Sequence, residues 1–436
     1  MVRKIIIIIT LILFTSIFSI LYFNYKLEIK EVKIIDFNNE SNELTIEIVK
    51  KNNIFNKPFY CTVFNNNIKL KEKNKKNSCT LKLKIGNDYS IILEDEFKKS
   101  KTYNILDFLD NVLEFEFIYD TIFLAPGESK KIEYKYKTIN GKIDSFNLID
   151  NVININDDII VANEAGTKEI SRNNKKMNVI VTDLIMKPTI IKNKQVVPCN
   201  KYTEDDAKIL DNILEYKVKE AGYKTRAGAV AAARFLTLQF PYRIPYFYEN
   251  GRLKGDINIA DGEGRYYHKG LYLHENKKKD IVASVSGPCI WGCPLLNWED
   301  DPDFGYIWGQ TKPNGLDCSG FVTWALYNGG YDVGDVGAGE TPRENQLTDK
   351  GEFTLLTNDL IYSNKIKVGD FFNYWGHITI IVGIDDKNFY VAESLQNFGG
   401  VVVNIYPKAT VNRTFNYVVL MDNYYQNDGN YTEYWQ

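Results

Sequence analysis

The sequence predicts an α+β domain at the C-terminus, preceded by all-β sandwich domains and an N-terminal transmembrane helix. Three observations lead to this fold class. An uncharged apolar run lies near the N-terminus, short segments of alternating apolar and polar residues follow, and a helical pattern succeeded by strand patterns closes the chain. The predicted boundaries are 1–26 for a cytoplasmic stub and anchor, 27–117 and 118–188 for two β-sandwiches, 189–300 for an accessory region, 301–425 for the α+β domain and 426–436 for a tail.

Length and composition fit several folded domains. The chain has 436 residues, of which 44% are hydrophobic and 25% are charged, so most of it can bury apolar cores. The formal net charge is -3, and the chain therefore has no basic excess with which to neutralise phosphates. Nucleic acid is excluded as the expected partner.

The N-terminal run predicts a membrane anchor. Residues 5–23 carry no charge, and a helix of that length spans roughly the hydrocarbon core of a bilayer. Arg3 and Lys4 precede the run, which predicts a cytoplasmic N-terminus and an exported remainder. Because no small-x-small cleavage site follows, we expect an uncleaved, single-pass protein of the cell membrane with its C-terminal domain outside the cell. A secreted protein is the alternative.

The first half of the chain has the pattern of short strands. Leu44–Val49 alternates apolar and polar residues, as a half-buried strand does, and Asn-rich turns separate such runs. We expect an antiparallel sandwich over 27–117. Further along, the opening Pro126–Tyr134 and the later segment Glu164–Ile170 resemble parts of a bacterial immunoglobulin-like domain. The resemblance implies a second sandwich that serves as a spacer.

The accessory region is expected to contain two helices. Thr203 is placed to cap a helix with apolar residues at helical spacing, and Gly222 ends it. A second helix is predicted over 226–240, before Pro241. The remainder of the region is rich in Tyr and Gly and either lines a substrate groove or forms core, and core packing is the favoured interpretation.

The six cysteines allow disulfides if the chain is exported. Cys61 and Cys79 both lie in strand-like runs and could pair, while Cys199 could reach Cys289 or Cys293. The remaining cysteine is Cys318, which must stay unpaired if it is a nucleophile. With only three histidines, the chain has no evident zinc-ligand spacing, and we expect neither a metal nor an organic cofactor.

The residues that indicate chemistry lie in the last third of the chain. Cys318 follows a Gly-containing loop and opens an apolar-periodic helix, so the partial positive charge of a helix N-terminus would favour its thiolate. His377 opens a predicted strand and could accept the thiol proton. Glu393, in the next strand, would orient the imidazole if the two strands pair in the right register.

The same residues resemble a known family. Asp317–Phe321, with Tyr306 before it and Gly376–Gly383 after it, is similar to the NlpC/P60 family over about the last quarter of the chain. These are papain-like cysteine peptidases that cut peptidoglycan stem peptides, typically between D-γ-glutamate and the diamino acid. The resemblance therefore implies a papain-like α+β domain and a peptidoglycan substrate.

Site roles follow from the resemblance residue by residue. Cys318 matches the nucleophile, His377 the general base and Tyr306 the tyrosine that supports the oxyanion site. Asp317 and Ser319 match positions that contact substrate in some members. The third catalytic position is often His, Asn or Gln in the family, and the aligned strand here offers the catalytic candidate Glu393, or Ala392 if the register differs by one.

Two other interpretations remain open from the sequence. An amidase or acyl transferase could use the same Cys–His pair, because the pocket rather than the pair decides the reaction. A wall-binding or secretion scaffold without catalysis is the second alternative, and a Cys318→Ala variant with unchanged products would support it.

Overall fold

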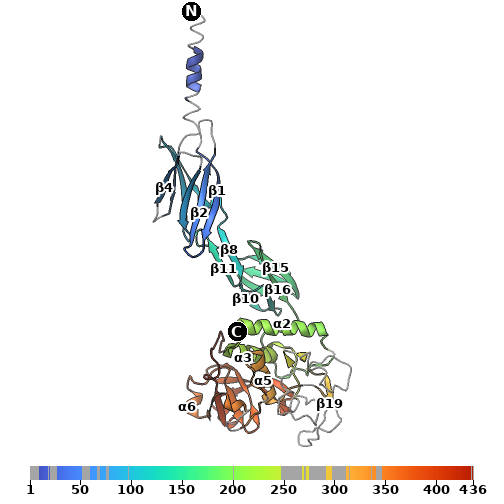
Figure 1. Cartoon of the computed structure of the whole chain (residues 1–436). Helices are drawn as coiled ribbons and strands as arrows, with labels where there is room; N and C mark the ends of the chain where they lie inside the picture. Colours follow the sequence, from blue (N-terminus) through green and yellow to red (C-terminus); the bar gives the residue numbers. More distant parts are fainter. Residues whose placement is uncertain are drawn as a thin grey trace, which may run out of the picture.

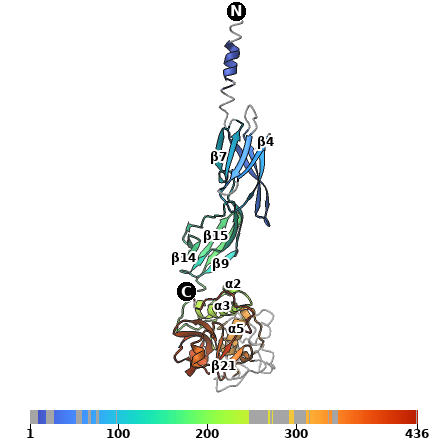
Figure 2. The same ribbon diagram turned by 90° about the vertical axis from the view of Figure 1, so that its left-hand side faces the viewer.

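The computed structural model is elongated, with its N-terminal helical segment at one end and a globular C-terminal part at the other (Figures 1 and 2). Two β-rich modules lie in line between these ends. The structure describes residues 9–17, 19, 27–51, 59–65, 69–74, 78–96, 98–199, 201–246, 268–269, 272–273, 291–296, 311–313, 315–334, 336–339, 346–433 and 435.

The N-terminal segment corrects the prediction of a membrane anchor over 5–23. Among the residues that the structure describes, no helix is both long and apolar enough to cross a bilayer. The prediction of a single-pass protein of the cell membrane is wrong on the same ground.

The first β module consists of two sheets. One has the order β1-β2-β5 and the other the order β4-β3-β6-β7, and all pairs are antiparallel. Alternate residues of β2 are buried, as the pattern at Leu44–Val49 predicts. A disulfide between Cys61 in β3 and Cys79 in β5 joins the two sheets. The strands are β1 Ile29–Asn38, β2 Glu43–Lys50, β3 Phe59–Phe64, β4 Lys69–Asn74, β5 Ser78–Lys84, β6 Ser90–Asp95 and β7 Ser100–Asn104.

The second β module has its own apolar core. Its sheets have the orders β11-β8, β10-β14-β13-β12 and β15-β16-β9, and β16 pairs with β9 in parallel. Gly127 has a φ of +78° in the turn before β10, a backbone conformation that glycine adopts readily. The strands are β8 Val112–Phe117, β9 Thr121–Leu124, β10 Ser129–Lys131, β11 Tyr134–Thr138, β12 Leu148–Ile149, β13 Ile153–Asn156, β14 Ile159–Ala162, β15 Gly166–Arg172 and β16 Lys175–Val181.

Helix α2, Glu204–Ala221, joins the second module to the globular part (Figure 1). Thr203 caps it through a reciprocal hydrogen-bonded box with Asp206, and Gly222 ends it, as the sequence predicts. Its Tyr216 is buried in the core of the second module, and Lys217 lies 2.9 Å from Glu128 of that module. The helix therefore contributes to two cores.

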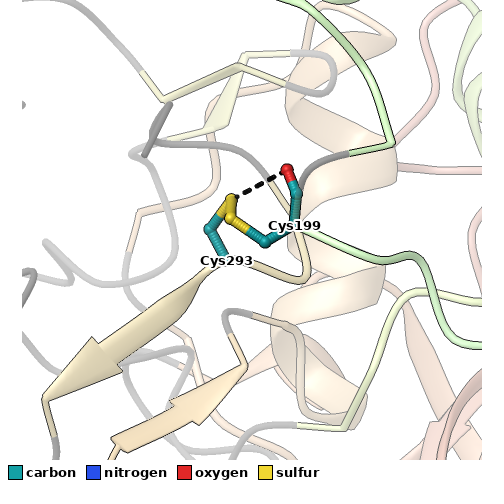
Figure 3. The surroundings of a disulfide bond; sticks show 2 residues. All are labelled: Cys199 and Cys293. Atoms are coloured by element: carbon teal, nitrogen blue, oxygen red, sulfur yellow. Dashed lines mark hydrogen bonds between the residues drawn. A yellow bond between two sulfur atoms is a disulfide. The ribbon is translucent and has the colours of Figure 1, made fainter. Parts of the chain in front are cut away.

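The globular part has one large core that spans the predicted accessory region and the C-terminal segment. That core contains apolar residues from α2, from helix α3 (Arg226–Arg234) and from helix α5 (Cys318–Asn328), together with residues of the C-terminal strands. A disulfide joins Cys199 to Cys293 (Figure 3), and Cys289 lies outside the described residues. Helix α3, Arg226–Arg234, continues as a short π-helical turn over Phe235–Gln239, in agreement with the second predicted helix.

The C-terminal strands correct the predicted fold class. The prediction of a papain-like α+β domain over 301–425 is wrong, because the described residues form mostly β-strands in several small sheets, with few helices. The strand that begins at His377 is interrupted at Thr379, between β23 and β24. The strands therefore form two separate sheets, β21-β27-β22-β23 and β24-β25-β26. The elements of this part are β17 His268–Lys269, β18 Tyr272–Leu273, β19 Pro294–Leu296, β20 Thr311–Pro313, α5 Cys318–Asn328, β21 Glu352–Leu355, α6 Asn358–Ile361, β22 Phe371–Tyr374, β23 His377–Ile378, β24 Ile380–Ile384, β25 Asn388–Leu395, β26 Gly400–Pro407 and β27 Tyr417–Leu420.

Buried charge fixes the end of the chain to α3. Arg226, the first residue of α3, is fully buried and lies 2.8 Å from Asp370 and 2.9 Å from Asp428, and it also bonds Asp422. Its guanidinium sits 4.8 Å from the ring centre of Tyr425. One arginine thus holds the segment before β22 and the segment after β27 against the same helix.

Candidate functional site

Cys318 is the first residue of α5, and the residues around it fix the start of that helix. Asp317 is the N-cap and accepts a hydrogen bond from the backbone N–H of Gly320 at 2.6 Å. The hydroxyl of Ser319 donates to the same carboxylate at 3.2 Å. The sulfur therefore lies at a helix N-terminus, where the backbone presents positive partial charge.

The Cys318 thiol is free and faces the hairpin that carries His377. Its side chain is buried, and Sγ lies 3.7 Å from the carbonyl oxygen of Gly376. Tyr374 of β22 pairs with His377 of β23, so the hairpin loop consists of Trp375 and Gly376 alone. Gly376 has a φ of +70°, which a glycine tolerates without strain. The tight turn brings the strand that begins at His377 beside the helix that begins at Cys318.

The imidazole of His377 lies between a thiol and a carboxylate. Its Nε2 is 2.7 Å from Oε2 of Glu393, and the Asn373 side chain donates to its backbone carbonyl at 2.9 Å. Its Nδ1 is buried without a hydrogen-bond partner among the described residues. Because Nε2 is occupied, Nδ1 is the ring nitrogen left for the thiol of Cys318, which is close enough to affect the imidazole pKa.

The electrostatics of the site favour a charged imidazole. Burial lowers the pKa of His377, but the interactions of its imidazole with the neighbouring Cys318 and Glu393 outweigh burial and raise the pKa from 6.5 to about 9. Tyr374 also faces this group, with its ring centre 4.8 Å from that of His377. Burial, Glu393 and Cys318 together raise the pKa of Tyr374, so its phenol remains protonated at neutral pH.

Glu393 is held on both of its oxygens. The side chain is 1% exposed, Oε2 bonds His377, and Oε1 accepts hydrogen bonds from Asn404 Nδ2 at 2.8 Å and from the Tyr406 hydroxyl at 2.7 Å. Burial and the neighbouring Glu393 raise the pKa of Tyr406, which keeps its phenol a donor. A buried carboxylate requires such partners.

The structure brings together three of the six residues expected in the site. Cys318, His377 and Glu393 form a contiguous group, in the order thiol, imidazole and carboxylate. Asp317 and Ser319 are buried, and their described contacts cap α5. Tyr306 lies outside the described residues.

Sequence reasoning missed Tyr374, Asn404 and Tyr406. The last two occupy alternate positions of one strand, so they lie on the same face of it. Their connection to Glu393 depended on the pairing of β25 with β26, which the sequence pattern alone did not fix. In the described part of the chain, no three His, Cys, Asp or Glu side chains are grouped to hold a metal ion.

Comparison with known proteins adds no identity. No family model, no curated protein and no solved structure matches the chain. The chemistry of the site must therefore be argued from its own contacts.

Proposed function

We propose that this protein is a cysteine peptidase that hydrolyses amide bonds in the stem peptides of peptidoglycan. The proposal depends above all on one arrangement of three side chains. The free thiol of Cys318 lies at a helix N-terminus beside the buried imidazole of His377, and Oε2 of Glu393 lies 2.7 Å from Nε2 of that ring. A thiol, a proton acceptor and a group that orients the acceptor are the parts that nucleophilic amide cleavage requires.

The proposed reaction has two halves. Cys318 gives its proton to His377, and the thiolate attacks the carbonyl carbon of the scissile amide. His377 then gives that proton to the leaving amine as the C–N bond breaks, which leaves a thioester on Cys318. In the second half, His377 takes a proton from water, the hydroxide displaces the thiolate, and the product acid leaves.

The chain's own groups support each charge in this scheme. A pKa of about 9 means that the imidazolium of His377 is the favoured form at neutral pH, which suits a thiolate–imidazolium pair. The carboxylate of Glu393 balances the imidazolium. In this scheme the backbone N–H of Cys318, at the start of α5, stabilises the oxyanion that forms beside the sulfur, and the hydroxyl of Tyr306 donates a second hydrogen bond.

The substrate class rests on the sequence resemblance. Asp317–Phe321 and Gly376–Gly383 are similar to the motifs of the NlpC/P60 peptidases, whose substrates are the stem peptides. We infer that the bond cut joins D-γ-glutamate to the diamino acid. The disulfides Cys61–Cys79 and Cys199–Cys293 support a protein that functions in an oxidising compartment, and peptidoglycan lies in such a compartment.

Digestion of purified peptidoglycan tests the proposal. The full chain is incubated with the polymer, and the products are identified by mass spectrometry. We expect new amine and carboxylate ends in the stem peptide, and their loss in Cys318→Ala. Ser171→Ala, an equally small change in the remote strand β15, serves as the matched control and should cleave as the wild type does.

Three results would count against the proposal. Unchanged products from Cys318→Ala would favour the scaffold interpretation. Release of whole stem peptides would indicate an amidase instead, and transfer of the acyl group to an added amine without hydrolysis would indicate a transferase.

A further inference from the structure

We propose that Asn404 and Tyr406 of β26 are positioning residues that hold Glu393 as a fixed, ionised partner of His377. The inference rests on the proposed Cys–His chemistry and adds two residues to it. Neither residue contacts the thiol in the described structure, and each would act through the carboxylate.

The register of the second small sheet places the three side chains together. β25 and β26 pair antiparallel, with Glu393 opposite Val402 and Val391 opposite Asn404. Asn404 is therefore the diagonal neighbour of Glu393, and Tyr406 follows two residues later on the same face. The longer tyrosine side chain covers the greater separation and still reaches Oε1 at 2.7 Å.

The need for two extra donors follows from the burial of Glu393. A carboxylate that is 1% exposed cannot stay ionised without partners that replace its hydration. His377 supplies one hydrogen bond to Oε2, and the amide and the phenol supply two to Oε1. Because both oxygens are bound, the carboxyl plane cannot rotate, and the imidazole that it holds keeps one orientation.

In the described part of the chain, the hydrogen-bond partners of this carboxylate are His377 from β23 and Asn404 and Tyr406 from β26. Tyr374 of β22 lies near enough to be affected by its charge, and Cys318 of α5 lies beyond the imidazole. None of the three hydrogen-bond partners carries a negative charge at neutral pH. Removing one of these hydrogen-bond donors should therefore make the Glu393 carboxylate easier to protonate. As the pH falls, Cys318 should then lose its thiolate form at a higher pH than in the wild type.

Alkylation of Cys318 measures this effect without any substrate. The rate at which iodoacetamide modifies Cys318 is followed from pH 4 to 9 in the full chain, for Tyr406→Phe, for Asn404→Leu and for the wild type, and peptide mass spectrometry distinguishes Cys318 from Cys289. Tyr406→Phe keeps the ring that packs 5.0 Å from the ring of Phe415 and loses only the hydroxyl. Tyr390→Phe is the matched control, because the Tyr390 hydroxyl also bonds a carboxylate, that of Asp385 at 2.7 Å, in the same sheet.

We expect the acid limb of the alkylation profile to move to higher pH by about half a unit to one unit in both variants and to stay in place in Tyr390→Phe. Peptidoglycan cleavage should lose about tenfold in kcat, which is the rate equivalent of one hydrogen bond to a charged group, with KM within about twofold. Asn404→Asp, which places a second carboxylate beside the first, should move the limb further than Asn404→Leu.

Two outcomes separate this inference from the proposed function. Profiles that coincide with the wild type in folded Tyr406→Phe and Asn404→Leu, checked by circular dichroism, would overturn the positioning role. A profile that moves as expected, in a protein whose wild type cuts no peptidoglycan, would support the positioning role and reject the substrate.

Discussion

At the scale of single residues, the protonation of His377 is linked to folding. Its side chain is almost fully buried, and its pKa in the folded chain is about 9 against an ordinary 6.5. Because the folded pKa is the higher one, the native state holds the proton more tightly than the unfolded chain. The stabilisation is complete below the ordinary pKa and is lost as the pH rises through the folded value.

This linkage predicts a stability that falls between pH 6.5 and about 9. The free energy of unfolding should decrease by up to about 3 kcal/mol across that window where Cys318 keeps its proton. The decrease is smaller where the proton on His377 comes from Cys318, because the pair then binds no extra proton. Urea unfolding at a series of pH values measures it. His377→Asn should flatten the dependence, and an equal slope in that variant would assign the linkage to another group.

The charge of Glu393 gives a second prediction at this scale. Glu393→Gln keeps the side-chain volume but cannot balance an imidazolium, so the pKa of His377 should fall towards 6.5 and kcat should drop by about a hundredfold. The histidine pKa is measured by NMR titration, which is practical because the chain has only three histidines. Full activity with an unmoved titration would mean that the carboxylate is only a packing group.

At the scale of elements, local patterns predicted the strands and helices well. The alternation in β2 and the cap at Thr203 are short-range features, and each can be read from the sequence without knowing which distant residues pack against the element. Apart from the predicted anchor over 5–23, the wrong prediction concerns how the strands are arranged. The break at Thr379 divides the C-terminal strands into two sheets, and such a break depends on how strands meet rather than on their composition.

In the candidate site, too, local features could be predicted from the sequence, whereas the pairing of distant strands could not. Cys318 and His377 were found because each begins an element, at a helix start and at a strand start respectively. Their roles in catalysis remain predictions. Asn404 and Tyr406 could not be connected to them, because a shift of one residue between β25 and β26 would turn both side chains to the other face.

The N-cap of α5 gives a prediction for a whole element. Asp317→Ala removes the acceptor for the Gly320 N–H, and we expect a loss of about 1 kcal/mol in stability together with slower alkylation of Cys318. Asp317→Asn keeps an acceptor and is the matched comparison. Thermal unfolding and alkylation are measured on the same samples. If Asp317→Ala alkylated at the wild-type rate, the order of the helix start would not govern the thiol.

At the scale of the whole molecule, Arg226 connects segments that are far apart in sequence. Arg226→Met would leave the carboxylate of Asp370, which is 1% exposed, without its cation. We expect a loss of roughly 3–5 kcal/mol in stability, since an unpaired buried charge remains. Calorimetry measures it, with the exposed Arg413→Met as control. Adding Asp370→Leu should restore part of the loss, and failure to do so would place the stabilisation in the contacts to Asp422 and Asp428.

Helix α2 limits how the protein can be divided for study. A fragment that ends at residue 188 would uncover the apolar surface of the second module that Tyr216 now fills, with Tyr119 and Phe123 stripped of their ring contacts. A fragment that starts at residue 189 would expose Tyr216 to water. A cut ahead of residue 112 leaves α2 with both of its cores and keeps the second module on the same fragment as Cys318. It separates Ile139 from the core of the first module, so we expect the C-terminal fragment to be the better folded of the two pieces.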